Sequence, residues 1–200
     1  MMKKSMLMIG VGVVMASGSA HAAVLGAPVS STASSEFSGA FVGTNLFDAS
    51  VSDSDIGVTA YGTADGQWAG SGVGPHTIFM DYGSSITATG VAYAQRAGDD
   101  PLLDKVSTIE FWFSNTDFGG VTPVTTPDAV ATITNTGDTV LTEYALGGTF
   151  SGQYVAARVS TTATSGNPGG SELRMTFIPE PGSLALLGLA GLMVARRRRA

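Results

Sequence analysis

Cysteine is absent from all 200 residues of this chain, and charged residues make up only 13% of it. The missing thiols exclude a disulfide framework, a cysteine nucleophile and a cysteine-based zinc site. Basic residues are rarest in the middle, where residues 23–178 hold four of them against fifteen acidic residues. Since binding to a phosphate backbone needs lysine and arginine, this excess of acid argues against a nucleic-acid partner.

Catalytic signatures are also scarce. His76 is the one histidine outside the first 22 residues, and neither G-x-S-x-G nor H-E-x-x-H occurs. The neighbouring carboxylates Asp99 and Asp100 stand between Gly98 and Pro101, and such a turn favours plain solvation. We therefore expect no enzymatic activity, and an extracellular hydrolase is the least favoured alternative.

The first 22 residues have the pattern of a Sec signal peptide. Lys3 and Lys4 precede an apolar run over residues 6–16, and Ala20-His21-Ala22 forms a small-residue cleavage site. The apolar run is too short for an N-terminal membrane span, and lipid attachment would need a cysteine. The mature chain is predicted to begin near Ala23, outside the cytoplasm.

The last 22 residues combine three features. Pro179-Glu180-Pro181 interrupts regular structure, because proline fixes φ and lacks a backbone donor. Residues 182–195 carry no charge, and as a helix they would span roughly 21 Å, which is marginal against a hydrocarbon core of ~30 Å. Residues 196–199 are four arginines, which mark the cytoplasmic side of a membrane.

This order of motif, apolar helix and basic end resembles the PEP-CTERM sorting signal of Gram-negative bacteria. The resemblance implies that exosortase, a membrane-embedded cysteine transpeptidase, recognises Pro179, Glu180 and Pro181. It also implies a precursor held transiently in the inner membrane by its C-terminal transmembrane helix, and a product at the cell surface or in the extracellular matrix. The alternative is an ordinary uncleaved tail anchor, which would have no need of Pro-Glu-Pro.

The middle of the chain is predicted to be all-β. Ile109, Phe111 and Phe113 alternate with Glu110 and Trp112, which is the period of a strand with two unlike faces. Further strands are predicted at residues 76–81, 86–94, 129–134, 140–146, 154–159 and 173–177, with turn residues between them. Many short strands without a long helical period favour a β-sandwich or jelly roll over residues 36–178, after a flexible lead-in at residues 23–35.

Residues 36–178 also resemble the discoidin-type, or coagulation-factor C-type, galactose-binding-like domain. The matching segments follow that family's order: residues 46–50, Trp68, and residues 75–83, 91–96, 106–115, 154–159 and 170–173. The resemblance implies a galactose-binding-like β-sandwich with its binding loops at one end.

A calcium site is predicted near the first of these segments. Asp48, Asp53 and Asp55 supply carboxylates within one loop, and calcium takes 6–8 oxygen ligands. Related sugar-binding domains close such a loop with a glutamate near the C-terminus, and Glu172 stands at the matching place. We expect Asp48, Asp53 and Glu172 to hold one structural Ca²⁺; the alternative is that they are solvated loop acids.

A sugar site needs an aromatic face and hydrogen-bond donors on loops. Trp68, Arg96 and Trp112 are the candidates by residue type, together with His76. Each has a structural alternative: Trp68 in the core, Trp112 on the second surface of the sandwich, and Arg96 paired with Asp99 or Asp100. The sequence thus predicts an exported, non-catalytic protein that binds extracellular polysaccharide, with a purely structural matrix or biofilm protein as the alternative.

Overall fold

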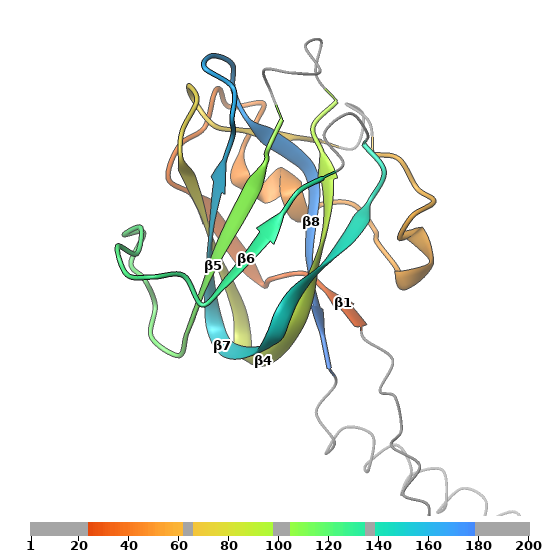
Figure 1. Cartoon of the computed structure of the whole chain (residues 1–200), viewed down its shortest axis with the longest axis vertical. Helices are drawn as coiled ribbons and strands as arrows, with labels where there is room; N and C mark the ends of the chain where they lie inside the picture. Colours follow the sequence, from red (N-terminus) through yellow and green to blue (C-terminus); the bar gives the residue numbers. More distant parts are fainter. Residues whose placement is uncertain (1–23, 62–65, 98–104, 135–138, 179–200) are drawn as a thin grey trace, which may run out of the picture.

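Two long strands, β4 (His76–Gln95) and β7 (Thr142–Ser160), run through both layers of the molecule and bend between them (Figure 1). The first half of β4 pairs with the second half of β7, and the remaining halves pair after a register shift between Asp81 and Ile86. Gly83 and Gly147 lie at the bends with φ of 72° and 75°, which residues with a Cβ rarely adopt. One hydrogen-bonded sheet therefore folds over into two layers.

The computed structural model describes residues 24–61, 66–97, 105–134 and 139–178. Its other strands are β1 (Val24–Gly26), β2 (Ser30–Ala33), β3 (Trp68–Ala69), β5 (Thr108–Ser114), β6 (Ala129–Thr132) and β8 (Gly169–Phe177). Two short 3₁₀ helices, η1 (Gly43–Phe47) and η2 (Asp53–Asp55), precede β3. The predicted signal peptide and C-terminal helix lie outside the described residues. Within those residues, no helix has the length and apolar character needed to cross a membrane.

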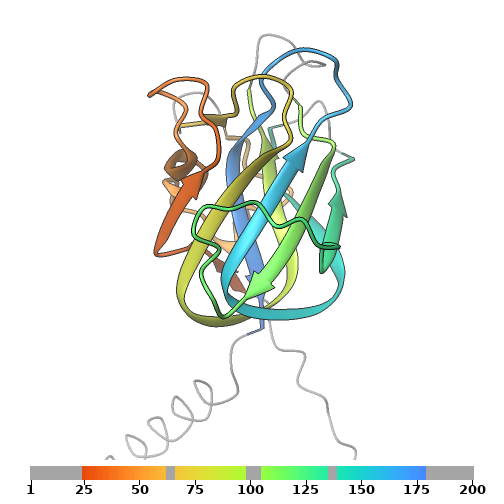
Figure 2. The same cartoon turned by 90° about the vertical axis from the view of Figure 1, so that its left-hand side faces the viewer.

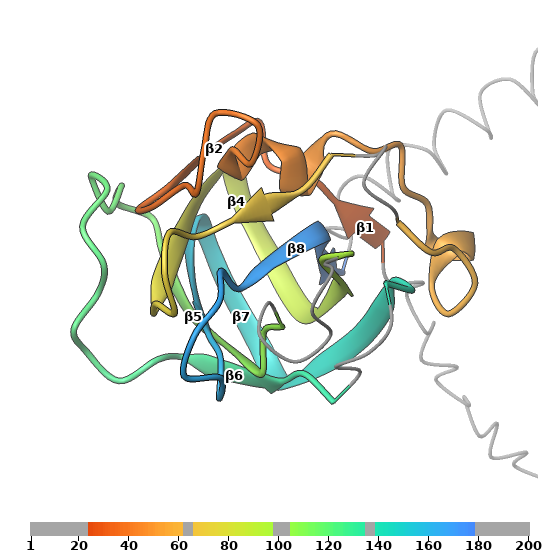
Figure 3. The same cartoon turned by 90° about the horizontal axis from the view of Figure 1, so that it is seen from above.

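All strand pairs are antiparallel, and the sheet order is β1-β8-β4-β7-β5-β6, with β2 on β4 and β3 on β8. One layer holds β2, β5, β6 and the adjoining halves of β4 and β7. The other holds β1, β3, β8 and the remaining halves, and the space between them is visible from above (Figure 3). The predicted all-β sandwich is confirmed.

The core between the layers follows the predicted alternation. Ile109 and Phe111 of β5 are fully buried in it, beside Ile78 of β4 and Leu173 of β8. Trp112 faces the other way and packs in a separate cluster. Strands with two unlike faces therefore form the layer, as period-two patterning requires.

The start of the chain differs from the prediction. The segment predicted as a flexible lead-in, residues 23–35, contributes β1, which pairs with β8, and β2, which pairs with β4. Within the described residues the sandwich begins at Val24, and its strands and buried core lie between residues 24 and 178. Val24 lies opposite Phe177, so the domain begins and ends side by side where β4 and β7 bend (Figure 2).

Candidate functional site

The outer face of the β2-side layer carries an ordered set of polar and aromatic side chains. Ser30 of β2 lies opposite Asp81 of β4, which lies opposite Tyr154 of β7. In the next row, Thr32 lies opposite Phe79. Directly opposed residues in an antiparallel pair point to the same face of the sheet. The strand register therefore places these five side chains together.

Residues 115–128, which connect β5 to β6, cross this face in front of the strands (Figure 2). The Nε1 of Trp112 donates to the carbonyl oxygen of Thr125 at 3.1 Å, and the hydroxyls of Thr77 and Thr122 are hydrogen-bonded at 2.9 Å. Phe118 packs on Phe79 with ring centroids 6.4 Å apart. The crossing segment is thereby fixed to the sheet and forms a wall above it.

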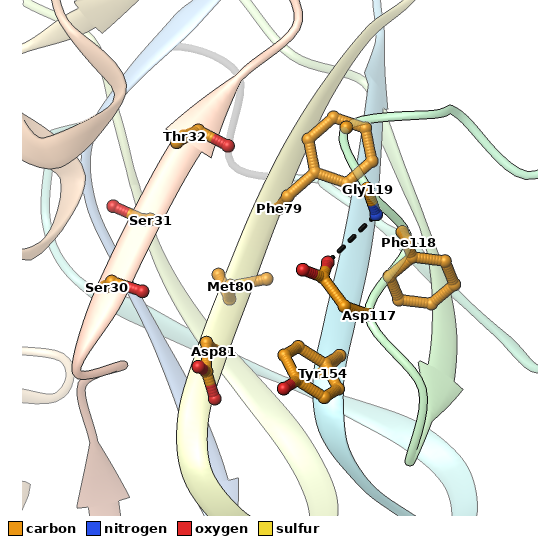
Figure 4. A pocket seen from close by; sticks show the side chains of 11 residues that line it. Ser30, Ser31, Thr32, Phe79, Met80, Asp81, Asp117, Phe118, Gly119 and Tyr154 are labelled. Carbon is orange, nitrogen blue, oxygen red and sulfur yellow. Dashed lines mark hydrogen bonds between the residues drawn. The ribbon is translucent and has the colours of Figure 1, made fainter.

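A cavity of about 230 Å³ remains between this wall and β2. We call it the β2 groove and define it by seven of its lining residues: Ser30, Thr32, Phe79, Asp81, Asp117, Phe118 and Tyr154. Figure 4 shows Asp117 extending from the wall toward β4, while the hydroxyl of Tyr154 points toward Asp81.

Several polar groups of the groove are left free to bind. Asp81 accepts hydrogen bonds from the backbone N–H of Gly83 at 2.7 Å and from Nε2 of Gln153 at 3.0 Å, both at Oδ1. Asp117 accepts one from the backbone N–H of Gly119 at 2.9 Å, also at Oδ1. Within the described residues, the second oxygen of each carboxylate has no hydrogen-bond partner. The same holds there for the hydroxyls of Ser30, Thr32 and Tyr154.

The two tryptophans predicted to contact a ligand are interior residues. Trp68 is 1% exposed, and its Nε1 donates to the carbonyl oxygen of Ser35 at 3.1 Å. Trp112 is 4% exposed beneath the guanidinium of Arg158. Neither indole has an open face on which a sugar could stack, so this burial does not support their predicted contact with a ligand.

Arg96, the third predicted ligand contact, lies in a different region from the β2 groove. Its guanidinium stacks over the ring of Phe41 at 4.8 Å, and Nη1 donates to the carbonyl oxygen of Asn167 at 3.0 Å. Asp99 and Asp100, the partners considered for it, lie outside the described residues. In this arrangement Arg96 joins the segment before η1 to the loop that leads into β8.

Glu172, predicted to close a calcium site, is fully buried and forms an ion pair with Arg174. The same guanidinium donates to the carbonyl oxygens of Leu46 at 3.1 Å and Ala49 at 2.8 Å. Burial raises the pKa of Glu172 to about 8, while the positive charge of Arg174 acts to lower it and the negative charge of Asp48 adds to the rise. The Arg174 guanidinium is therefore a cation at the loop where calcium was expected.

Within the described residues, the predicted calcium ligands are not gathered into one metal-binding cluster. Oδ1 of Asp53 accepts a hydrogen bond from the backbone N–H of Leu25 at 3.0 Å. Across the described ranges, no group of three or more His, Asp or Glu side chains could hold a metal ion. Calcium binding by Asp48, Asp53 and Glu172 stays a prediction for titration to test, and Arg174 would compete with it.

The sequence analysis missed both Arg174 and the groove. Glu172 lies directly before the predicted strand at residues 173–177, and the observed strand β8 begins at Gly169, so Glu172 and Arg174 share a face of it. The groove is harder to foresee, because it joins residues from β2, β4, β7 and the β5–β6 connection.

Comparison with known proteins bears on the C-terminal segment and on the fold of the sandwich. Residues 177–199 match the PEP-CTERM protein-sorting motif. This chain carries a PEP-CTERM sorting signal. The match includes Pro179, Glu180 and Pro181 and confirms the sequence-based recognition of the tail. Motifs of this class mark exported proteins of the cell surface. A search of curated proteins found no match.

Several solved structures of sugar-binding proteins have a similar fold. The family 32 carbohydrate-binding module of C. perfringens NanJ, solved with galactose, has 13% identity and a TM-score of 0.52, covering 74% of this chain and 92% of its own. The family 32 module of AlyQ, solved with 4,5-unsaturated mannuronic acid, has 17% identity and a TM-score of 0.50, covering 76% and 96%. A fucolectin from striped bass serum has 13% identity and a TM-score of 0.52, covering 74% and 46%. These likenesses confirm the galactose-binding-like fold.

Proposed function

We propose that this protein is an exported, exosortase-processed component of the cell surface or the exopolysaccharide matrix, with a sandwich that binds glycan without catalysis. The observation that carries the proposal is the joining of a PEP-CTERM motif at residues 177–199 to a galactose-binding-like sandwich with an open groove. A protein routed to the cell surface meets polysaccharide there, and the groove supplies a surface on which to hold it.

The β2 groove has the chemistry of a sugar site. A sugar presents hydroxyls along its edge and C–H groups on its faces, so it is held by hydrogen-bonding groups next to apolar surface. The hydrogen-bonding groups are the carboxylates of Asp81 and Asp117 and the hydroxyl of Tyr154. The apolar surface comes from the rings of Phe118 and Tyr154. The volume of about 230 Å³ is below the roughly 300–1,000 Å³ of pockets for drug-sized ligands. It suits one monosaccharide unit.

A binding role is favoured over hydrolysis. His76 is 6% exposed, its Nε2 is hydrogen-bonded to the carbonyl oxygen of Gly72 at 2.8 Å, and its ring packs against Trp68. It is therefore not available to the groove as a general base. We propose that the protein is not an enzyme.

The tail supplies the route to the surface. In this proposal the apolar residues 182–195 hold the precursor in the inner membrane until exosortase acts at Pro179-Glu180-Pro181. Replacing those three residues by alanine should leave the protein in the membrane fraction with its tail intact. Normal release of that variant from the membrane would contradict exosortase processing.

A glycan array probed with residues 24–178 tests the binding function. We expect binding to at least one glycan, and we expect the variant Tyr154→Ala to lose it while keeping the circular dichroism of the native sandwich. Absence of binding to every glycan would favour the alternative from the sequence analysis, a purely structural matrix protein.

A further inference from the structure

All four basic side chains of the sandwich already contact other groups of the protein. Arg158 pairs with Glu110 at 2.6 Å and lies over Trp112, and Arg174 pairs with Glu172. Lys105 donates to the carbonyl oxygen of Arg96, whose own guanidinium stacks on Phe41. Each basic group is thus already bound within the protein, so none is left to pair with a uronate, sulfate or phosphate group of a ligand.

The β2 groove, in contrast, holds two carboxylates from different elements. Asp81 comes from the floor of the groove and Asp117 from its wall. Each has one oxygen fixed by a protein donor, which sets the orientation of the carboxylate, and a second oxygen without a partner in the described part of the chain. Two negatively charged carboxylates in fixed orientations, with free hydroxyls beside them, select a ligand that carries both a positive charge and hydroxyl groups.

We infer that the β2 groove binds an amino sugar, with the protonated amine of a hexosamine held by the carboxylates of Asp81 and Asp117. This inference rests on the proposed glycan-binding function and names its ligand class. The amine donates charge-assisted hydrogen bonds to the free carboxylate oxygens. The sugar hydroxyls bond to Tyr154 and to Ser30 or Thr32.

The aromatic surface distinguishes a sugar from a simple cation. Phe118 and Tyr154 are half-buried, so part of each ring remains available to the C–H face of a pyranose. The absence of any three-residue metal cluster within the described residues argues against a divalent ion as the ligand. A basic peptide would satisfy the carboxylates but would leave the free hydroxyls without matching partners.

Calorimetric titration of residues 24–178 tests the inference with three matched probes: a β-1,4-linked trimer of glucosamine, its fully N-acetylated form, and the corresponding trimer of glucose. We expect the glucosamine trimer to bind about tenfold more tightly than the other two, because acetylation and hydroxyl replacement both remove the charge. Added salt should lower the affinity for the glucosamine trimer alone, because salt screens the attraction between its amines and the carboxylates.

The variants Asp81→Asn and Asp117→Asn remove charge but keep an oxygen for the Gly83 and Gly119 N–H groups. Each should lower the affinity for the glucosamine trimer by about tenfold. Glu143→Gln is the matched control, since Glu143 is an exposed carboxylate on the other half of β7. It should leave every affinity unchanged, and circular dichroism checks that all three variants fold.

Each alternative outcome has a distinct meaning. Equal affinity for the three trimers would overturn the amino-sugar inference while leaving the glycan-binding function in place. Absence of binding to all three, with binding to other glycans on the array, would also overturn it. Equal affinity for a lysine tripeptide would show a general cation site and would overturn the choice of a sugar. Absence of binding to any glycan would overturn both proposals.

Discussion

The guanidinium of Arg174 forms an ion pair with Glu172 inside the molecule, and the same group donates to the backbone of η1 and of the loop that follows it. Both side chains are nearly or fully buried, at 4% and 0% exposure. Because the guanidinium also bonds to the carbonyl oxygens of Leu46 and Ala49, it ties β8 to a segment more than 120 positions earlier in the chain. The positive charge that orders this loop is therefore supplied by the protein itself.

Removing Arg174 should strongly destabilise the sandwich. Arg174→Ala removes the buried hydrogen-bonding partner of Glu172 and leaves the carbonyl oxygens of Leu46 and Ala49 without their donors. Each buried polar group left unsatisfied costs about 1–3 kcal/mol. Arg158→Ala is the matched control, because the Arg158–Glu110 pair is 28% and 23% exposed and such pairs contribute about 1 kcal/mol or less. Urea unfolding measures both, and equal losses would contradict the role given to Arg174.

The calcium prediction can be tested by comparing the wild type with Arg174→Ala. With the Arg174 guanidinium in place, we expect EDTA and added Ca²⁺ to leave the melting temperature of the wild type unchanged. In Arg174→Ala, the uncompensated Glu172 and Asp48 should instead gain stability from Ca²⁺, as a ligand that binds only the folded state requires. A rise in melting temperature for the wild type that Glu172→Ala removes would restore the predicted metal site.

Stability should depend on pH through Glu172. Its pKa is raised from 4.5 to about 8 in the folded state, mainly by burial. The folded protein then binds the proton more tightly than the unfolded chain does. The stabilisation of the folded state by protonated Glu172 is complete below pH 4.5 and is lost as the pH rises through about 8.

Unfolding measured at several pH values between these limits gives the slope, which cannot exceed about 1.4 kcal/mol per pH unit for one group. Glu172→Gln does not titrate, so its stability should stay level where that of the wild type declines. A parallel decline in both proteins would assign the pH dependence to another group.

Trp68 should matter for stability and not for binding. Its indole is 1% exposed and packs beside His76 with ring centroids 6.2 Å apart. Trp68→Ala should cost about 3–5 kcal/mol through the cavity it leaves. The milder Trp68→Phe keeps the fold for glycan titration, and we expect its affinities to equal those of the wild type. A selective loss of affinity in Trp68→Phe would return Trp68 to the binding site.

The parts of the fold that the sequence could predict are those with strong local signals. Alternation around Ile109 and Phe111 identified β5, and Pro179-Glu180-Pro181 identified the sorting signal. The two strands at the start were missed, because β1 and β2 are only three and four residues long. Their pairing depends on β8 and β4, which no local pattern reveals. Strands predicted separately on either side of Gly83 and of Gly147 are continuous, since glycine lets the chain bend without ending the strand.

The site was less predictable than the fold for a physical reason. Aromatic residue type alone pointed to Trp68 and Trp112, but large aromatic rings are also the residues that fill cores. The β2 groove depends on which residues face each other across strands, and that follows from register. Asp81 and Asp117 are 36 positions apart in the sequence, and each by itself has the pattern of an acidic residue in a turn. Only the crossing of residues 115–128 over the sheet brings them to one cavity.

The most direct test of the central claim is where a glycan touches the protein. Residues 24–178 labelled with ¹⁵N can be titrated with the glucosamine trimer and the glucose trimer while amide resonances are followed. Glycan binding in the β2 groove predicts that the largest shifts fall on Thr32, Asp81 and Gly119, with the amides of Arg96 and Asn167 unmoved. Shifts centred on Arg96 and Asn167 would place the sugar at the loop end of the sandwich and contradict the groove.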